Sequence, residues 1–538
     1  MSQAADDGAT SARSEWALLG GGLALSLTIY LLRLDRVVGL FVDDAWYALL
    51  AKSLATGQGY QLINSPTPGI LPLYPPGFPF LLSLLYRLSP DFPGNIWLLK
   101  MLSIAAMMGL GVAAYFYFNR HRATPRNLAA GLAVVAILCP LLVSMATSSL
   151  MSECVFALLV MGQLLATERF ARASRPAWAM LVLAAFLAAL AFLTRSVAVG
   201  LIAGVFLYLL KEKMVRAALI FAALVALFAG PWTIYSRTHA PTPDQQLEQG
   251  GYILQPYQTQ LWQRVAGVRS AGTITVADLP ARAAKNINQI AGQDTLRILA
   301  TPVFQWLRGP AAQDGGGLVV SYLLFLLVLL GFILAVREKI TAAEIAIPLM
   351  LGVIVLWPWE TIRFVLPLAP FFFYYFVRGV GGLLQRLRLS AENPLTGKLI
   401  AGTMVLLLAA SLMSHGSYLW EQYLASNLER PAWLMAFDDT EKLMEWIDKN
   451  IPESETVIAN NPALVNLYTG HRTISFELNP ERWDYYRRKN IRYLVLSNYL
   501  GNPTPPGLRN YPAVYRVKNV QDFRVIDLGP GESRPPLE

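Results

Sequence analysis

The chain has 538 residues, of which 55% are hydrophobic and 15% are charged, and its formal net charge is +9. Soluble proteins carry about 25% charged residues, so this composition excludes a globular protein with one hydrophobic core and indicates a multi-pass membrane protein. The basic residues are spread through short gaps between apolar runs, which argues against a nucleic-acid partner.

Membrane spans follow from the lengths of the apolar runs, because roughly 20 residues are needed to cross a hydrocarbon layer. We predict about eleven transmembrane helices, at about 16–35, 96–118, 128–145, 152–168, 178–194, 197–210, 216–235, 317–336, 342–357, 364–380 and 398–415. The first is expected to be a retained helix and not a signal peptide, since it is long and no small-residue cleavage site follows it.

The orientation follows from the Lys and Arg residues of the short gaps, which are enriched on the cytoplasmic side of membrane proteins. If all eleven spans cross, the most basic gaps fall on one side, and they hold Arg120, Arg122, Arg126, Arg169, Arg172, Arg175, Lys211, Lys213, Arg216, Arg337, Lys339, Arg386 and Arg388. This pattern predicts that the N-terminus is inside and that the C-terminus is outside.

Three long segments then lie on the outer side of the membrane. Segments 36–95 and 236–316 are expected to be outer loops of a transmembrane domain formed by residues 1–415. Residues 416–538 are expected to form a separate soluble domain outside the cytoplasm.

The outer loops contain amphipathic stretches that can form a roof over a membrane cavity. Ala45–Leu54 and Phe78–Leu88 are too short to cross comfortably and are expected to lie at the membrane surface. Lys285–Leu307 has apolar residues at roughly helical spacing, which predicts a further helix.

The tail has the pattern of a small α/β domain. Lys442–Ile451 predicts an amphipathic helix, and Thr456–Ala459, Ile491–Ser497 and Arg524–Ile526 predict short strands between Pro, Gly and Asn signals.

Two adjacent acids, Asp43 and Asp44, come just after the first span. Paired carboxylates at a lipid surface repel each other and need a cation, a metal or a substrate hydroxyl as a partner, and one of them can serve as a general base. The alternative is that the pair caps the helix beginning at Ala45, where acids suit the positive end of the helix dipole. Both roles can coexist, with one carboxylate capping the helix and the other facing a cavity.

Three more ionisable residues are predicted at the outer ends of spans. Glu153 begins the fourth span, where it either faces a cavity or caps the helix. Arg195 and Arg363 are basic exceptions on the outer side, and their planar guanidinium groups either bind phosphate or reach the lipid headgroups. Acids and arginines that converge there would suit a reaction that activates a hydroxyl and releases a phosphate, which suggests glycosyl transfer.

Metal binding receives no support from residue spacing. Cys139 and Cys154 lie in apolar segments and are expected to be packing residues. The histidines that we place outside, His239, His415 and His471, lack the spacing of a zinc site. We assign no metal or other cofactor, although a divalent metal stays possible.

An ordered set of motifs gives the chain a resemblance to polyprenyl-phosphate-dependent GT-C glycosyltransferases, the superfamily of protein O-mannosyltransferases and the lipid A aminoarabinose transferase. The motifs are Asp43-Asp44-Ala45-Trp46-Tyr47-Ala48, Tyr74-Pro75-Pro76-Gly77-Phe78-Pro79, Met151-Ser152-Glu153, Leu193-Thr194-Arg195, Gly230-Pro231-Trp232 and Arg363-Phe364-Val365-Leu366-Pro367. The resemblance covers about residues 16–415, and the tail looks like the small extracytoplasmic domain common in bacterial members.

The resemblance implies roles for individual residues. Asp43 matches the catalytic base that deprotonates an acceptor hydroxyl as it attacks the anomeric carbon with inversion. Asp44 stands where the family usually has Glu, so its share of the base or orienting work is less defined. Glu153 would position the acceptor or help to bind a metal, and Arg195 and Arg363 would hold the lipid phosphate. Further positions of the outer-loop motifs are Tyr47, Tyr74, Pro75, Pro76 and Gly77.

The predicted function is transfer of one sugar from a polyprenyl-phosphate donor to a hydroxyl on a lipid-linked glycan, a cell-envelope polymer or a protein. The predicted place is the outer face of a bacterial cytoplasmic membrane. The Trp-Trp-Asp signature of oligosaccharyltransferases is absent from the sequence, which argues against transfer of a whole glycan to asparagine by that branch. The alternatives are a flippase or transporter of a polyprenyl-linked sugar and a non-catalytic assembly subunit. The nearly charge-free middles of the spans favour chemistry at the surface over transport.

Overall fold

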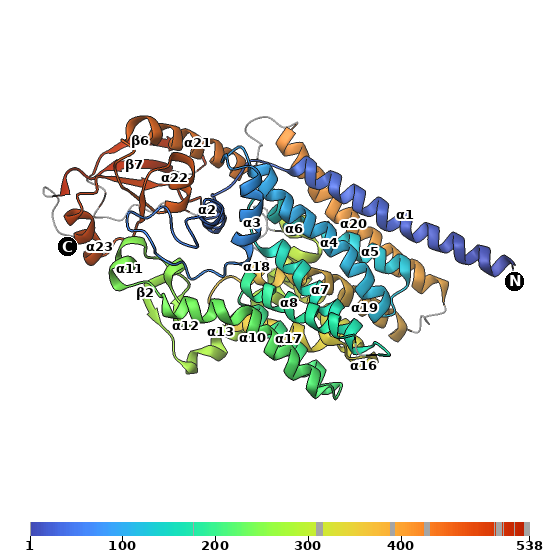
Figure 1. The fold of residues 1–538 in the computed structure, drawn as a ribbon. Helices are drawn as coiled ribbons and strands as arrows, with labels where there is room; N and C mark the ends of the chain where they lie inside the picture. Colours follow the sequence, from blue (N-terminus) through green and yellow to red (C-terminus); the bar gives the residue numbers. More distant parts are fainter. Residues whose placement is uncertain are drawn as a thin grey trace.

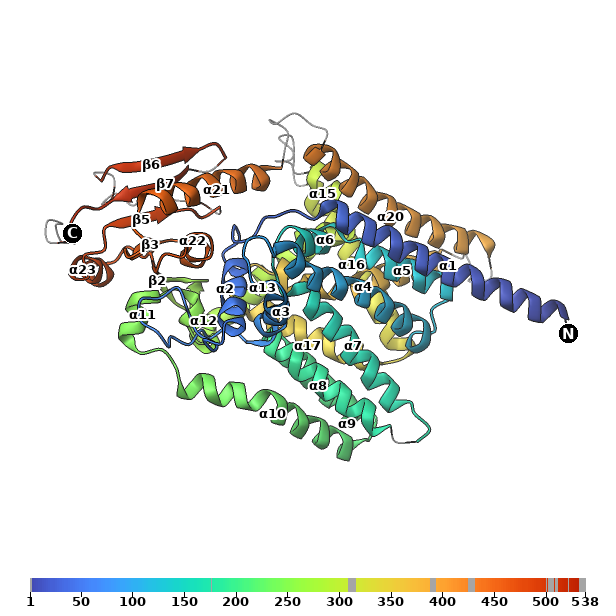
Figure 2. The ribbon, with the colours of Figure 1, turned by 45° about the horizontal axis from the view of Figure 1, so that its top comes forward.

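The computed structural model describes residues 2–175, 177–307, 316–387, 393–423, 431–499, 501, 508, 511–520 and 522–531. Long helices form one bundle, and the C-terminal domain lies beyond the end of this bundle that is opposite the N-terminus (Figure 1). The two long loops that the sequence predicts on the outer side, and that keep the name outer loops, lie between the bundle and this domain (Figure 2).

Seven helical segments in the described part of the chain are long and apolar enough to cross a membrane. They are Trp16–Arg33 within α1 (Ser2–Arg33), α4 (Ile96–His121), α7 (Glu153–Ala171), α10 (Val215–Thr238), Gly317–Glu338 within α16 (Gly316–Glu338), Ile362–Arg386 and α20 (Pro394–Tyr423). The segment Ile362–Arg386 joins α18 (Ile362–Val365), the 3-10 turn η4 (Leu366–Leu368) and α19 (Ala369–Arg386). The chain is therefore an integral multi-pass membrane protein.

An eighth candidate span is made of two helices, α5 (Arg126–Ile137) and α6 (Pro140–Thr147), which meet at an angle of 50°. Pro140 begins α6 and has no backbone N–H to continue the hydrogen bonds of α5, which accounts for the break. The other three predicted spans correspond to the shorter apolar helices α8 (Trp178–Thr194), α9 (Ala198–Lys211) and α17 (Ala342–Leu356).

Glycines allow close helix contacts inside the bundle. A side chain at Gly331 of α16 would overlap the carbonyl oxygen of Tyr375 in α19, and one at Gly379 of α19 would overlap that of Leu327. Small residues at such crossings are typical of helix packing in membranes, because dispersion contacts replace the hydrophobic effect there.

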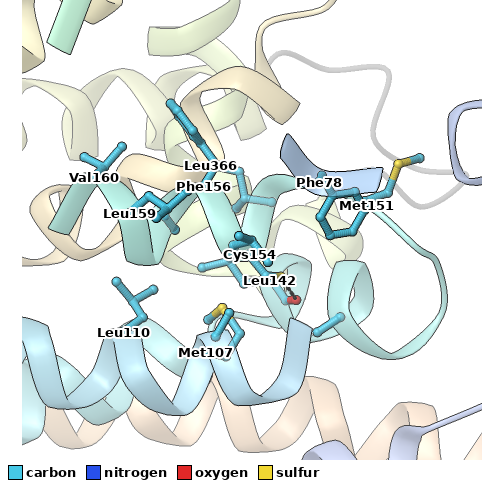
Figure 3. Packing of buried hydrophobic residues seen from close by; sticks show 14 of the residues in the cluster. Phe78, Met107, Leu110, Leu142, Met151, Cys154, Phe156, Leu159, Val160 and Leu366 are labelled. Carbon is cyan, nitrogen blue, oxygen red and sulfur yellow. Dashed lines mark hydrogen bonds between the residues drawn. The ribbon is translucent and has the colours of Figure 1, made fainter. Parts of the chain in front are cut away.

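A dense apolar core lies between α4, α6 and α7 (Figure 3). The Sγ atom of Cys154 lies 3.6 Å from the carbonyl oxygen of Leu142, and Cys139 makes a similar contact with Ile298. Both cysteines are free and buried.

The first outer loop contains α2 (Asp43–Ala55) and α3 (Gly77–Leu88). The stretch Ala45–Leu54, which we expect at the membrane surface, falls within α2. Its apolar residues from Ala45 to Ala51 are all buried, because α3 covers one side and the C-terminal domain covers another.

The second outer loop consists of many short elements. The single helix predicted over Lys285–Leu307 corresponds to several of them. The loop contains α11 (Pro243–Gln249), η1 (Tyr252–Leu254), α12 (Tyr257–Leu261), β1 (Gln263–Val265), β2 (Val268–Thr273), η2 (Val276–Asp278), α13 (Leu279–Gln289), the π-helical turn η3 (Ile290–Asp294), α14 (Thr295–Leu299) and α15 (Thr301–Leu307). The predicted helix is thus interrupted by a π-turn and by Ala300, whose backbone leaves the helical region.

The C-terminal domain is built on a mixed five-stranded sheet of order β4-β3-β5-β7-β6. Its elements are α21 (Ala432–Asn450), β3 (Val457–Ala459), α22 (Pro462–Thr469), β4 (Thr473–Ser475), α23 (Pro480–Arg488), β5 (Tyr493–Leu496), β6 (Ala513–Lys518) and β7 (Asp522–Asp527). Strand β3 is parallel to β4 and β5, and β7 is antiparallel to β5 and β6. The predicted helix over Lys442–Ile451 corresponds to the second half of α21, and the three predicted strands correspond to β3, β5 and β7.

Candidate functional site

Asp43 is presented by a strained turn at the start of α2. Val42 has φ 65° and ψ −58°, and the amide of Asp43 donates to the carbonyl of Phe41 over 2.8 Å, which together define a γ-turn with positive φ. A β-branched residue in this conformation costs about 1–3 kcal/mol, and such strain gathers at functional sites. The turn directs the Asp43 side chain into a cavity.

The Asp43 carboxylate accepts three hydrogen bonds. Its Oδ1 accepts from the hydroxyls of Tyr74 at 2.6 Å and Tyr252 at 2.7 Å, and its Oδ2 accepts from Nη1 of Arg363 at 2.8 Å. Burial raises the pKa of Asp43, but the Arg363 charge and the tyrosine hydrogen bonds outweigh burial and leave this pKa below its ordinary value. Asp43 is therefore an ionised acceptor at neutral pH.

Asp44 has a different environment and does not line the cavity. Its side chain is fully buried and accepts from the backbone amides of Gly39 at 2.7 Å, Phe41 at 3.2 Å and Ala45 at 3.0 Å. Burial, with the neighbouring Asp43 charge, raises the pKa of Asp44 to about 6 although the backbone hydrogen bonds oppose this shift. One acid of the pair thus closes the turn, and the other faces the cavity.

Glu153 joins the two arginines. Its Oε1 accepts from Nη1 of Arg195 at 3.0 Å and from Nε of Arg363 at 2.8 Å, while its Oε2 is buried without a protein partner. The side chain of Glu153 is fully buried, and Arg195 also donates to Ser152 over 3.1 Å. Asp43, Glu153, Arg195 and Arg363 therefore form one charge-balanced cluster at the ends of four separate helices.

The outer-loop motif supports this cluster from one side. The hydroxyl of Tyr47 lies 3.3 Å from Oγ of Ser152, and the ring of Tyr47 contacts that of Tyr74. Pro75 lines the cavity, and Pro76 precedes the first turn of α3. A Cβ atom on Gly77 would lie 2.7 Å from the carbonyl oxygen of Leu193, so only glycine lets α3 approach the end of α8 beside Arg195.

The cavity has a volume of about 470 Å³ and combines Asp43, Arg195 and Arg363 with an aromatic wall, whereas Glu153 lies behind the arginines and does not line it. Its lining residues are Phe41, Asp43, Tyr47, Tyr74, Pro75, Met145, Ser149, Met151, Thr194, Arg195, Ser196, Val197, Tyr252, Tyr257, Gln260, Trp357, Trp359, Glu360, Arg363 and Phe364. Aromatic walls with a few convergent polar groups are typical of ligand sites.

The sequence prediction missed one side of this cavity. Tyr252, Tyr257 and Gln260 come from the second outer loop, whose irregular path no periodicity indicates. Trp357, Trp359 and Glu360 stand immediately before Arg363 in the sequence, and this proximity is the signal that could have identified them.

Metal binding is not supported by clustering of ligands. In the part of the chain that the structure describes, no three His, Cys, Asp or Glu side chains come together as metal ligands.

Sequence comparison identifies no relative, since no protein-family model and no curated protein matches the chain. Solved structures match it over nearly its whole length. ArnT from Cupriavidus metallidurans in the apo state is 13% identical with a TM-score of 0.56, and the match covers 96% of this chain and 98% of that chain. The same protein bound to undecaprenyl phosphate is 12% identical with a TM-score of 0.56, and the match covers 95% and 98% of the two chains.

A second match is the Archaeoglobus fulgidus oligosaccharyltransferase in complex with Zn and sulfate. It is 12% identical with a TM-score of 0.55, and the match covers 89% of this chain and 67% of that chain. The chain therefore shares its fold with these proteins, and the resemblance drawn from its ordered motifs is confirmed at the level of the fold.

Proposed function

We propose that the protein is an inverting glycosyltransferase that moves one sugar from a polyprenyl-phosphate donor to an acceptor hydroxyl. The acceptor is a lipid-linked glycan, a cell-envelope polymer or a protein. We further propose eleven membrane crossings in a bacterial cytoplasmic membrane, with the N-terminus inside and both the cavity and the C-terminal domain outside. The observation that carries the proposal is the ionised Asp43 in the cavity, joined through Arg363 to Glu153 and Arg195.

The reaction is a single displacement. The acceptor oxygen attacks the anomeric carbon, its proton passes to the Asp43 carboxylate, and the bond between the anomeric carbon and the phosphate oxygen breaks. The electron pair of that bond leaves with the polyprenyl phosphate, so the configuration at the anomeric carbon inverts. A positioned general base of this kind contributes about 10²–10⁴-fold to the rate.

The two arginines serve the leaving group. Guanidinium groups bind phosphate oxygens in a bidentate manner and stabilise the charge that develops on them. Glu153 holds Arg195 and Arg363 through one oxygen atom, which fixes both guanidinium groups before the donor binds.

Donor binding also frees the base. In this structure Nη1 of Arg363 donates a hydrogen bond to Oδ2 of Asp43. A phosphate that draws Nη1 toward itself leaves Oδ2 open to the acceptor hydroxyl, while Tyr74 and Tyr252 continue to hold Oδ1. The Asp43 carboxylate then becomes more basic, because its largest favourable charge partner has turned to the phosphate.

The test is sugar transfer in membranes supplied with a panel of radiolabelled polyprenyl-phosphate sugars. Wild type is compared with Asp43→Asn and with Asp91→Asn, an exposed aspartate of the same outer loop, at matched protein levels. We expect label to pass from one donor to an endogenous acceptor with wild type and Asp91→Asn, and transfer to fall by about 100-fold or more with Asp43→Asn. Equal transfer by Asp43→Asn would overturn the proposal and favour the flippase or the assembly subunit.

A further inference from the structure

The C-terminal domain contacts the turn that carries the acid pair. Asn461, at the start of α22, donates from Nδ2 to the carbonyl oxygen of Gly39 over 2.7 Å. Tyr468, near the end of the same helix, donates to the carbonyl of Val38 over 3.1 Å. Gly39 has φ +103°, and a side chain on it would overlap Leu464 of α22. The helix is therefore seated directly on this segment of backbone.

Gly39 also connects Asn461 to the acid pair through hydrogen bonds. Its carbonyl accepts from Asn461, while its amide donates to Oδ2 of Asp44 over 2.7 Å. Asp44 binds the amides of Phe41 and Ala45 through its other oxygen and so closes the backbone around Val42. One continuous set of hydrogen bonds thus runs from Asn461 through Gly39 and Asp44 to the γ-turn that presents Asp43.

Asn461 contacts the Gly39 backbone but does not reach the cavity. Its side chain is fully buried and does not line the cavity. Its Oδ1 accepts from the amide of Leu464 at 3.3 Å and caps α22, so the side chain joins the rigid end of a helix to the Gly39 carbonyl.

The C-terminal domain also makes hydrogen bonds to both outer loops away from Gly39, and these hold α22 in place. The amide of Thr473 donates to the carbonyl of Asn64 in the first loop over 2.7 Å. Glu248 of the second loop accepts from Thr67 of the first loop at 2.6 Å and from Tyr485 of the C-terminal domain at 3.1 Å. These contacts are typical of a structural clamp and not of a lid that swings over the cavity.

We infer that Asn461 is a positioning residue for sugar transfer, and that the C-terminal domain holds the Gly39–Asp44 turn so that Asp43 stays aligned with its substrate. The inference rests on the proposed function. A misplacement of about 1 Å in a catalytic group can cost about 100-fold in rate, so loss of this contact reduces kcat. Donor binding is spared, because Glu153 holds both arginines independently of Asn461.

The experiment uses the full chain in membranes with the donor that the panel identifies. Asn461→Ser keeps a side-chain oxygen to cap α22 but is too short to reach Gly39. The matched control is Asn466→Ala in the same helix, since Asn466 donates to the carbonyl of His471 over 2.8 Å and makes no contact with the Gly39 turn. Asp43→Asn is measured in parallel.

We expect Asn461→Ser to lower kcat by about 10-fold to 100-fold with less than a twofold change in donor KM. Asn466→Ala should keep the wild-type kcat, and the two variants should have similar thermal unfolding midpoints. Asn461→Ser with wild-type kcat, beside an inactive Asp43→Asn, would overturn the positioning role alone. Equal losses of kcat in the Asn461 and Asn466 variants would also overturn it, and an active Asp43→Asn would overturn the proposed function itself.

Discussion

Arg363 holds Asp43 and Glu153 with two different nitrogen atoms, each at 2.8 Å. Its guanidinium therefore connects the proposed base to the buried acid that orients both arginines. Because the connection uses two separate nitrogen atoms of the planar guanidinium group, a lysine, whose donors share one nitrogen atom, could not reproduce both contacts in this geometry.

This geometry predicts that Arg363→Lys lowers sugar transfer by about 10²–10³-fold at matched protein levels, the range found when a preorganised donor to a developing anion is removed. The measurement is the initial rate of label transfer from the polyprenyl-phosphate donor. The control is Arg378→Lys in α19, since Arg378 forms an exposed ion pair with Glu338 far from the cavity. A wild-type rate for Arg363→Lys would contradict a role for the guanidinium group of Arg363.

The two acids of the pair should respond differently to replacement by asparagine. Asp43→Asn removes the base and leaves the fold intact, so activity falls while the thermal unfolding midpoint in detergent changes little. Asp44→Asn places an amide N–H₂ against backbone donors inside the protein, and an unsatisfied buried group costs about 1–3 kcal/mol. We therefore expect Asp44→Asn to lower the unfolding midpoint as well as the activity. A stable but inactive Asp44→Asn would instead assign chemistry to Asp44.

The sequence already places Asp43, Glu153, Arg195 and Arg363 at helix ends, since apolar run length locates those ends, and the positive-inside bias predicts that they lie on the outer side. The sequence also predicts that one acid of the pair can accept hydrogen bonds from backbone amides, as Asp44 does. Hydropathy could not reveal the break before Pro140 or the short length of α8, α9 and α17, because these helices are as apolar as full spans.

Tyr252 illustrates what the sequence could not predict. It lies in a loop without regular periodicity, and it reaches Asp43 only because α11 and η1 are held by contacts with the first loop and the C-terminal domain. The sequence also did not predict the burial of α2, for a related reason. Its covering helix, α22, belongs to a domain more than 400 residues away in the chain, and no local pattern shows that it packs there.

The dependence of transfer on pH tests the role of Tyr252. A general base works in its ionised form, so the rate falls as pH drops through the pKa of Asp43, and the lowered pKa places that loss below the ordinary value of 3.8. Tyr252→Phe removes a hydrogen bond that lowers this pKa, so the acidic limb of kcat/KM should move to higher pH. The titratable groups that interact with Asp43 are Arg363, Tyr74, Tyr252, Asp44, Tyr47 and Tyr257 among the described residues.

The comparison is made between Tyr252→Phe and wild type from pH 8 down to about pH 3, a range that includes values below 3.8, where Asp43 of the wild type takes up its proton. Asp44, whose pKa is raised to about 6 by burial, titrates in both proteins. Tyr235→Phe in α10 is the control, as Tyr235 is exposed and stacks on His239 away from the cavity. An acidic limb that stays in place in Tyr252→Phe would mean that Asp43 does not limit the rate at low pH.

Two glycines of the recognised motifs should differ in their tolerance of a methyl group. At Gly77 the added Cβ lies 2.7 Å from the carbonyl oxygen of Leu193, so α3 must move away from α8 and from Arg195. Overpacking of this kind costs about 1–3 kcal/mol, and we expect Gly77→Ala to lower both the unfolding midpoint and the affinity for the donor. Gly230 in α10 has open space within 4 Å, so Gly230→Ala should leave the affinity for the donor unchanged and should not lower the unfolding midpoint, because alanine favours the helix more than glycine does. If donor KM were the same in the two variants, the contact between α3 and α8 would not position Arg195, and the Tyr74-Pro75-Pro76-Gly77 stretch would serve the stability of the loop alone.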